Sequence, residues 1–102
     1  MVVKKKLKVN WTAKAVQSLE NHYHRIKEES PQSADKVRRE ILKAVKALPT
    51  HPKQYQIDEY YPKESGEIRR FFKWRYRIVY EIREDTIDVL NIIHTSQEPS
   101  TE

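Results

Sequence analysis

Residues 68–94, IRRFFKWRYRIVYEIREDTIDVLNIIH, set the architecture of this chain. The stretch is rich in β-branched and aromatic residues, which favour strands over helices. We predict three consecutive strands at 68–74, 75–83 and 86–94, with a tight turn at Glu84-Asp85 between the last two. The first turn lies near Lys73 to Arg75, where no glycine or asparagine marks its position.

Two helices are expected before these strands, because the apolar residues upstream recur at helical spacing. Thr12 is the expected N-cap of the first helix, which should end near Glu29. Ser30-Pro31 then starts the second helix, with serine as N-cap and proline at the first helical position, and Pro49 and Pro52 stop it. With almost no loop between them, the helices should pack as an antiparallel hairpin. Their apolar stripes contain Ala15, Val16, Leu19, Tyr23 and Ile26, and then Ala34, Val37, Ile41, Val45 and Leu48.

The remaining segments complete a sheet. Residues 2–9 alternate loosely between apolar side chains and lysines, a pattern typical of an edge strand with one wet face. Residues 55–60 indicate a short strand, and residues 63–67, which contain the only glycine, indicate a loop. The predicted order is therefore β-αα-ββββ. This is an α+β fold in which the N-terminal strand and the helical hairpin pack on one face of a mostly antiparallel sheet.

The alternation of side chains along the strand at 76–82 assigns its two faces. Tyr76, Ile78, Tyr80 and Ile82 share one face, and Arg77 lies on the other. The first set should meet the helices, which places Arg77 on the face that the helices leave open.

The composition is that of one small soluble domain. Of the 102 residues, 37% are hydrophobic and 34% are charged, enough for a single modest core. We expect one domain over residues 1–95 and a polar C-terminal tail over residues 96–102. There is no cysteine, which fits a reducing cytoplasm and leaves no thiolate metal site. The basic N-terminus lacks the apolar region of a signal peptide, and no segment approaches the length of a membrane span.

Charge is unevenly distributed along the chain. All 20 Lys and Arg residues lie at or before Arg83, against ten acids in the same range, whereas residues 84–102 carry five acids and no base. The basic part has the charge needed to bind a polyanion, although a solvated Lys/Glu surface has the same composition.

The nine residues 69–77 hold five positive charges, four aromatics and no acid. Arginine suits bidentate phosphate contacts, and interleaved aromatics offer stacking surfaces for unpaired bases. The structural alternative is that the aromatics belong partly to the core and the arginines cover a strand. We favour a binding role for the cluster as a whole.

His94 closes the last predicted strand and is the candidate general acid or base. Cleavage of a phosphodiester also needs a cation near the developing oxyanion, and Arg77 on the neighbouring strand is the candidate. Tyr80 offers a hydroxyl, although its place in the apolar alternation favours core packing. Asp58-Glu59 is a lone acidic pair that offers an alternative base. The other histidines lack metal-ligand spacing, so neither a metal nor a cofactor is expected.

Taken in order, these features resemble the RelE/ParE superfamily of toxins from type II toxin–antitoxin systems. The resemblance covers nearly the whole chain, and its strength lies in the ordered combination of motifs. The matching residues are Trp11-Thr12 with Ala15 and Leu19, Ser30-Pro31 with Ala34, Leu48 with Pro52, Tyr76-Arg77-Ile78-Val79-Tyr80, and Val89-Leu90-Asn91-Ile92-Ile93-His94.

The resemblance implies a small cytoplasmic growth inhibitor that a cognate antitoxin holds silent. In the RelE-like branch, the toxin cuts mRNA on the ribosome without a metal, by attack of the 2′-hydroxyl on the adjacent phosphate. Arg77, His94 and a basic residue at Arg69 or Arg70 match the residues that act there. In the ParE-like branch, the same fold binds DNA gyrase and performs no chemistry. No membrane partner is implied in either branch.

One departure from the family pattern bears on the choice between these branches. Many members carry an arginine just after the last strand, whereas this chain has Thr95-Ser96-Gln97-Glu98. Cleavage of mRNA, inhibition of gyrase and a binding-only role thus remain as alternatives. The expected catalytic residues are Arg77, His94 and Arg70. The residues expected to bind nucleic acid or the antitoxin are Arg69, Lys73, Arg75, Tyr80 and Gln97.

Overall fold

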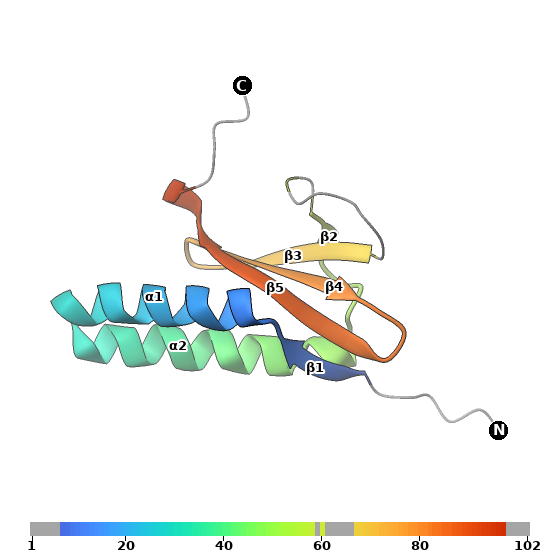
Figure 1. Ribbon diagram of the computed structural model, residues 1–102, viewed down its shortest axis with the longest axis horizontal. Coiled ribbons are helices and arrows are strands. Elements are labelled where there is room, and N and C mark those ends of the chain that lie inside the picture. The colour runs from blue at the N-terminus through green and yellow to red at the C-terminus, as the bar shows by residue number, and fades with distance from the viewer. Residues whose placement is uncertain (1–6, 59, 61–66, 98–102) are drawn as a thin grey trace.

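The computed structural model describes residues 7–58, 60 and 67–97. The chain forms one strand, two helices and four further strands, as predicted, with two short 3-10 turns (Figure 1). In chain order the elements are β1 (Lys8–Trp11), α1 (Ala13–Glu29), α2 (Pro31–Lys46), η1 (Leu48–Thr50), β2 (Gln56–Ile57), β3 (Glu67–Lys73), β4 (Tyr76–Ile82), β5 (Thr86–His94) and η2 (Thr95–Gln97).

The five strands form one sheet in the order β1-β5-β4-β3-β2. Strand β1 pairs with β5 in parallel, and the other neighbours are antiparallel. The α1–α2 hairpin covers one face of this sheet (Figure 1). The expected N-terminal strand is present at the edge of the sheet, but it starts at Lys8. The earlier residues of the predicted strand, up to residue 6, lie outside the described part of the chain.

Both helices begin at the positions that their capping residues predicted. The hydroxyl of Thr12 accepts a hydrogen bond from the backbone N–H of Ala15 at 3.2 Å, and the hydroxyl of Ser30 accepts one from Ser33 at 3.2 Å. Pro31 occupies the first turn of α2, where its missing N–H has no partner to lose. The chain therefore reverses at Ser30 without a loop.

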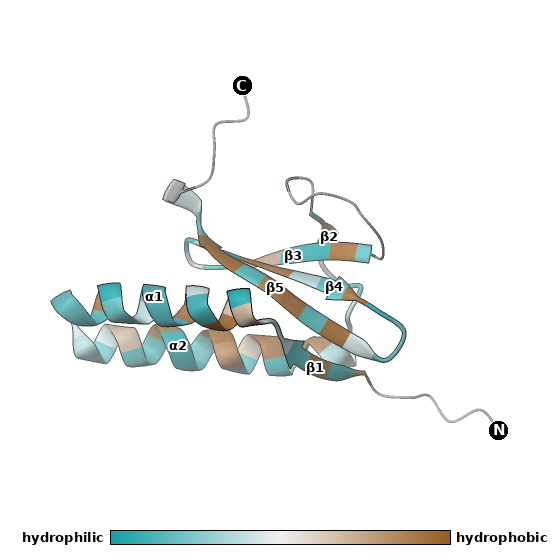
Figure 2. Ribbon diagram, in the orientation of Figure 1, coloured by the Kyte–Doolittle hydropathy of each residue, from teal (hydrophilic) through white to brown (hydrophobic). Residues whose placement is uncertain are grey.

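The core lies between the helical hairpin and the sheet. Apolar and polar segments alternate along β5 in Figure 2, as expected for a strand with one face against this core. Burial of each large aliphatic or aromatic side chain contributes about 1.5–3 kcal/mol. The buried cluster contains Ala15, Leu19, Ile41, Val45, Leu48, Phe71, Tyr76, Ile78, Tyr80, Ile87, Val89 and Ile92.

A β-bulge in β5 interrupts the alternation. Tyr80 pairs with Val89 but Val79 pairs with Asn91, so Leu90 is an extra residue between them. The side chain of Asn91 then accepts hydrogen bonds from the hydroxyl of Ser18 at 2.6 Å and from the backbone N–H of Ile92 at 2.8 Å. Ile92 and His94 therefore point to the helix face, opposite to the face that simple alternation from Val89 gives them.

Within the described ranges, no helix combines the length and the hydropathy needed to cross a membrane.

Candidate functional site

The turn of the β3–β4 hairpin consists of two residues, Trp74 and Arg75, because Lys73 pairs with Tyr76. This places the turn inside the range that the sequence predicted. Trp74 has a backbone φ of +55°. A positive φ at the first of two turn residues is the pattern of a type II′ turn, a position that glycine normally occupies. For a residue with a side chain this conformation costs about 1–2 kcal/mol.

The sheet divides the cationic cluster between its two faces. Paired residues on neighbouring strands share a face, so Arg69, Phe71 and Lys73 face the helices with Tyr80, Ile78 and Tyr76. Arg70 and Phe72 face the other way, with Val79 and Arg77. The nine residues therefore do not form one continuous binding surface.

Arg69 is held by its own chain. Its guanidinium donates hydrogen bonds to the Glu67 carboxylate and to the Tyr55 carbonyl, and its side chain is 17% exposed. Phe71 is buried, and its ring stacks on that of Tyr55 with 5.0 Å between the ring centroids. The Arg69 guanidinium is therefore engaged within the chain, and its role in binding stays a prediction. The alternative that part of the cluster belongs to the core holds for Phe71.

The exposed part of the cluster lies at the end of the hairpin. Phe72 is 51% exposed and Trp74 is 52% exposed. The Arg70 guanidinium lies over the Phe72 ring at 5.2 Å, and the Lys73 ammonium lies over the Trp74 ring at 5.2 Å. Arg75 is exposed beside them. Arg70 and Phe72 lie on the far face of β3, whereas Lys73, Trp74 and Arg75 lie at the end of the hairpin; we call these five residues the hairpin patch.

The predicted face of Arg77 is correct, but the residue is buried there. Arg77 does lie on the face opposite the helices, but only 3% of it is exposed, because its guanidinium donates to the carboxylate of Asp58. The Tyr60 ring lies 5.1 Å from the same guanidinium. Asp58 is 1% exposed and also accepts a hydrogen bond from the Tyr60 N–H at 3.2 Å. Asp58 is therefore the partner of Arg77 rather than a free base, and Glu59 lies outside the described residues.

Tyr80 is a residue of the core. Its side chain is fully buried, and its hydroxyl donates a hydrogen bond to the carbonyl of Pro52 at 2.6 Å. Burial raises the pKa of Tyr80 to about 12, so this hydroxyl keeps its proton at neutral pH. The structure thus bears out the core interpretation of Tyr80, and its role in binding stays a prediction.

His94 lies on the helix side of the sheet because of the bulge at Leu90. It pairs with Tyr76, and the two rings meet edge to face with 5.1 Å between centroids. Its Nδ1 lies 2.6 Å from the hydroxyl of Ser96. His94, Tyr76 and Ser96 line an open hollow together with Arg25, which α1 supplies.

The three residues expected to act in catalysis are not brought together. Arg70 and Arg77 lie on the far face of the sheet, whereas His94 lies on the helix face. Of the residues expected to bind a ligand, Lys73 and Arg75 lie in the hairpin patch. Gln97 lies in η2, and its side chain is outside the described part of the structure.

His22 is a buried polar residue that the sequence interpretation missed. It is 6% exposed, and its Nε2 donates to the carbonyl of Ile92 at 2.8 Å while its Nδ1 faces the Arg25 guanidinium at 3.1 Å. Burial lowers the pKa of His22, the Ile92 carbonyl opposes this, and the charge of Arg25 and the proximity of His94 lower it further. Its position three residues after Leu19, on the apolar stripe of α1, is the signal that could have revealed it.

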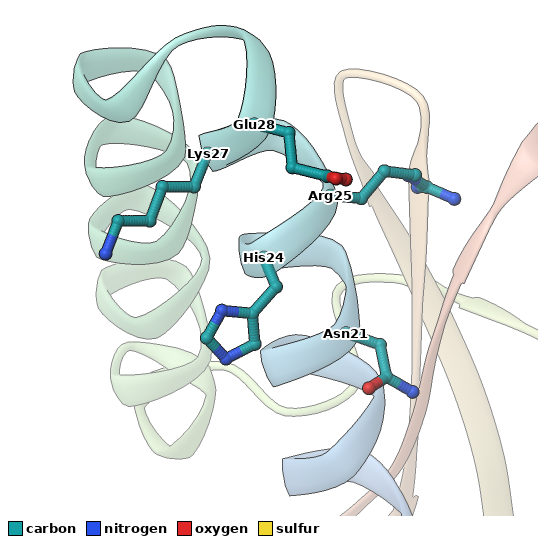
Figure 3. Close-up of a pocket in the computed structure, with 5 residues that line it drawn as sticks. All are labelled: Asn21, His24, Arg25, Lys27 and Glu28. Carbon is teal, nitrogen blue, oxygen red and sulfur yellow. The ribbon is translucent and has the colours of Figure 1, made fainter.

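The C-terminal half of α1 carries a second open hollow, lined by polar and charged side chains. Figure 3 shows Arg25 and Glu28 projecting to one side of α1 and Lys27 to the other, so the charges are mixed. No group of three or more His, Cys, Asp or Glu side chains among the described residues is placed to hold a metal ion. This surface does not show the chemistry of a metal centre.

Comparison with known proteins identifies the family. The family model of the ParE toxin of the type II toxin–antitoxin system parDE matches residues 9–99. A solved structure of the chromosomal ParDE TA system from P. aeruginosa is similar, with a TM-score of 0.71 and 22% identity, over 87% of this chain and 96% of that chain. The YoeB dimer from Staphylococcus aureus is similar with a TM-score of 0.52 and 16% identity, over 84% of this chain and 93% of that chain.

No curated protein matches the sequence significantly. At these identities the two solved structures establish the fold alone, while the family match spans nearly all of the chain. On this match, the chain belongs to the ParE toxin family of type II toxin–antitoxin systems.

Proposed function

We propose that this toxin arrests growth by binding a protein target and that it performs no chemistry on RNA. The target that the resemblance implies is DNA gyrase. The observation that carries the proposal is the buried Arg77–Asp58 ion pair, which occupies the guanidinium that a nuclease of this superfamily would place at the scissile phosphate.

The position of His94 supports the same proposal. Phosphodiester cleavage requires an acid or base and a cation around one phosphate. In the β4–β5 register Arg77 pairs with Ile93, and His94 pairs with Tyr76. Because side chains alternate between the faces of a sheet, Arg77 and His94 point to opposite sides. One phosphate cannot contact both groups.

The test is to express the toxin alone in bacteria, to follow growth, and to map mRNA 5′ ends by primer extension. We expect growth arrest without new 5′ ends, and we expect the purified toxin to inhibit supercoiling by gyrase. The His94→Ala variant should remain toxic. New 5′ ends within translated codons that disappear in His94→Ala would overturn the proposal.

Ribosome-dependent mRNA cleavage is the second candidate, and the surroundings of His94 are the observation in its favour. The imidazole is partly exposed and lines a hollow with Arg25, Tyr76 and Ser96. If this site is catalytic, its cation is Arg25 rather than Arg77. The Arg25→Ala variant should then lose cleavage, while the exposed Arg39→Ala variant on α2 should keep it.

For the antitoxin, we propose an acidic, amphipathic segment that binds along β3 and β4 and contacts the exposed members of residues 69–77. The excess of positive charge before residue 84 supports this placement. A segment that folds on binding loses conformational entropy but covers a wide surface. Reversal of the exposed Arg75 to glutamate should weaken capture of the antitoxin, whereas Arg39→Glu, with the same charge change on α2, should not. Equal binding by both variants would refute the placement.

A further inference from the structure

Trp74 occupies a position where neither the backbone nor the core requires a tryptophan. Its φ of +55° suits glycine, and its side chain is 52% exposed. Strained residues persist where the surroundings hold them, and they concentrate at functional sites. The structure therefore gives no folding reason for the indole at the end of the hairpin.

Phe72 repeats the same arrangement on β3. Its ring is 51% exposed, and the guanidinium of Arg70 lies over it as the ammonium of Lys73 lies over the ring of Trp74. A cation that lies against an aromatic face is attracted to it, which restrains both side chains. The hairpin patch is thus a pair of exposed aromatic rings with ordered cations around them.

The charge of the hairpin patch indicates the charge of its partner. Arg70, Lys73 and Arg75 are all cationic, and Lys73 lies 3.7 Å from the carboxylate of Glu40 on α2. For Arg75, no carboxylate lies within ion-pair distance in the part of the chain that the structure describes. Arg75 is therefore the cation of the patch that a carboxylate of the partner can meet, beside the exposed rings of Phe72 and Trp74.

A protein fits this patch better than a nucleic acid does. Nucleic-acid strands are bound by grooves that follow the backbone and by aromatic faces that are open to successive bases. Here the aromatic rings already carry a cation of the same chain, and they sit at the end of a hairpin. Tryptophan and arginine are the residue types that most often dominate the affinity of protein–protein interfaces.

We infer that the hairpin patch is the surface with which this toxin binds its protein target, and that the indole of Trp74 inserts into an apolar pocket rimmed by acidic residues. This inference rests on the proposed function, because it assumes a target that is bound rather than cut. In this inference the indole of Trp74 supplies most of the affinity for the target, whereas a wide charged surface supplies most of the affinity for the antitoxin.

The test uses Trp74→Gly in the full-length toxin, because glycine accepts the backbone conformation without strain. The melting temperature of this variant should equal or exceed that of the wild type, so a loss of function cannot come from unfolding. Growth arrest should weaken at least tenfold, measured as the inducer concentration that is needed for arrest. Leu42→Ala, which trims another exposed apolar residue, on α2, is the matched control and should stay fully toxic.

The outcomes separate this inference from the proposed function. Full toxicity of Trp74→Gly would overturn the inference, as would a loss of antitoxin capture with toxicity retained. If the wild type cuts mRNA and Trp74→Gly abolishes the cuts, the patch binds RNA or the ribosome, and a protein target of this kind is refuted. If the wild type leaves gyrase unaffected but Trp74→Gly still loses toxicity, gyrase is the wrong target and the hairpin patch is the right surface.

Discussion

Asp58 and Arg77 form an ion pair that is buried at both ends: the side chain of Asp58 is fully buried, and that of Arg77 is 4% exposed. The pair joins the segment after β2 to the middle strand of the sheet, 19 residues further along the chain. It therefore ties the segment after β2 to the far face of the sheet.

The first prediction concerns this pair. Replacement of Arg77 by alanine leaves the Asp58 carboxylate buried without its partner, which should lower the free energy of unfolding by about 3–5 kcal/mol. Equilibrium unfolding in urea measures the change. The double variant Asp58→Asn, Arg77→Met removes both charges and should be more stable than Arg77→Ala. If Arg77→Ala is as stable as the wild type, the ion pair does not hold the fold together.

The second prediction is a pH dependence of stability that arises from His22. Burial lowers the pKa of His22 in the folded protein below its ordinary value of 6.5, so the unfolded chain binds this proton more readily than the folded chain does. The free energy of unfolding should be fully maintained above pH 6.5 and should decline as the pH falls from there through the lowered pKa. Urea midpoints between pH 7.5 and pH 5 measure this decline.

Two substitutions isolate the contribution of His22. Gln at position 22 keeps an amide donor for the Ile92 carbonyl but does not titrate, so His22→Gln should flatten the pH dependence. His24 is exposed on the same helix, and His24→Gln should leave the pH dependence as it is. A pH profile that His22→Gln does not alter would assign the decline to other groups.

The third prediction concerns Thr12, whose hydroxyl serves two elements. It caps α1 through the Ala15 N–H and donates to the Val89 carbonyl of β5 at 2.8 Å. Thr12→Ala should lower the free energy of unfolding by about 1–2 kcal/mol, at the upper end of the range for an N-cap. Thr12→Ser keeps the hydroxyl and should recover most of this loss in the same urea experiment. An equal loss in both variants would show that the methyl group, and not the hydroxyl, is responsible.

The fourth prediction tests whether the hydroxyl of Tyr80 contributes to stability or to toxicity. Tyr80→Phe removes the hydrogen bond to the Pro52 carbonyl and should cost about 1 kcal/mol of stability, because only the hydroxyl is lost from the core. Growth arrest on expression should not change. If the Tyr80→Phe variant is stable but not toxic, the hydroxyl of Tyr80 has a functional role.

The sequence predicted those features that depend on neighbouring residues. The N-caps at Thr12 and Ser30, the end of α1 at Glu29 and the start of β5 at Thr86 all follow from local hydrogen bonding and periodicity. The element order and the side of the sheet that the helices cover followed from these local signals.

The features that the sequence did not predict depend on distant contacts. Simple alternation along β5 from Val89 puts His94 on the same face as Arg77, and one extra residue at Leu90 moves it to the other face. A bulge depends on the pairing between two strands, because it places two residues of one strand opposite one residue of the other, and the sequence of β5 alone does not mark it. Likewise, Arg77 looks like an exposed cation until Asp58, from a separate segment, is placed against it. For these two reasons the sequence did not predict where the candidate catalytic residues lie relative to one another.

The parallel pairing of β1 with β5 has a consequence for the timing of folding. Strand β1 is synthesised before both helices, yet its hydrogen-bonding partner is made after all the other strands. The α1–α2 hairpin is local and can form early, while the closing contacts span most of the chain and form slowly. A nascent or truncated chain that lacks β5 leaves β1, Thr12 and His22 without the hydrogen-bonding partners that β5 supplies.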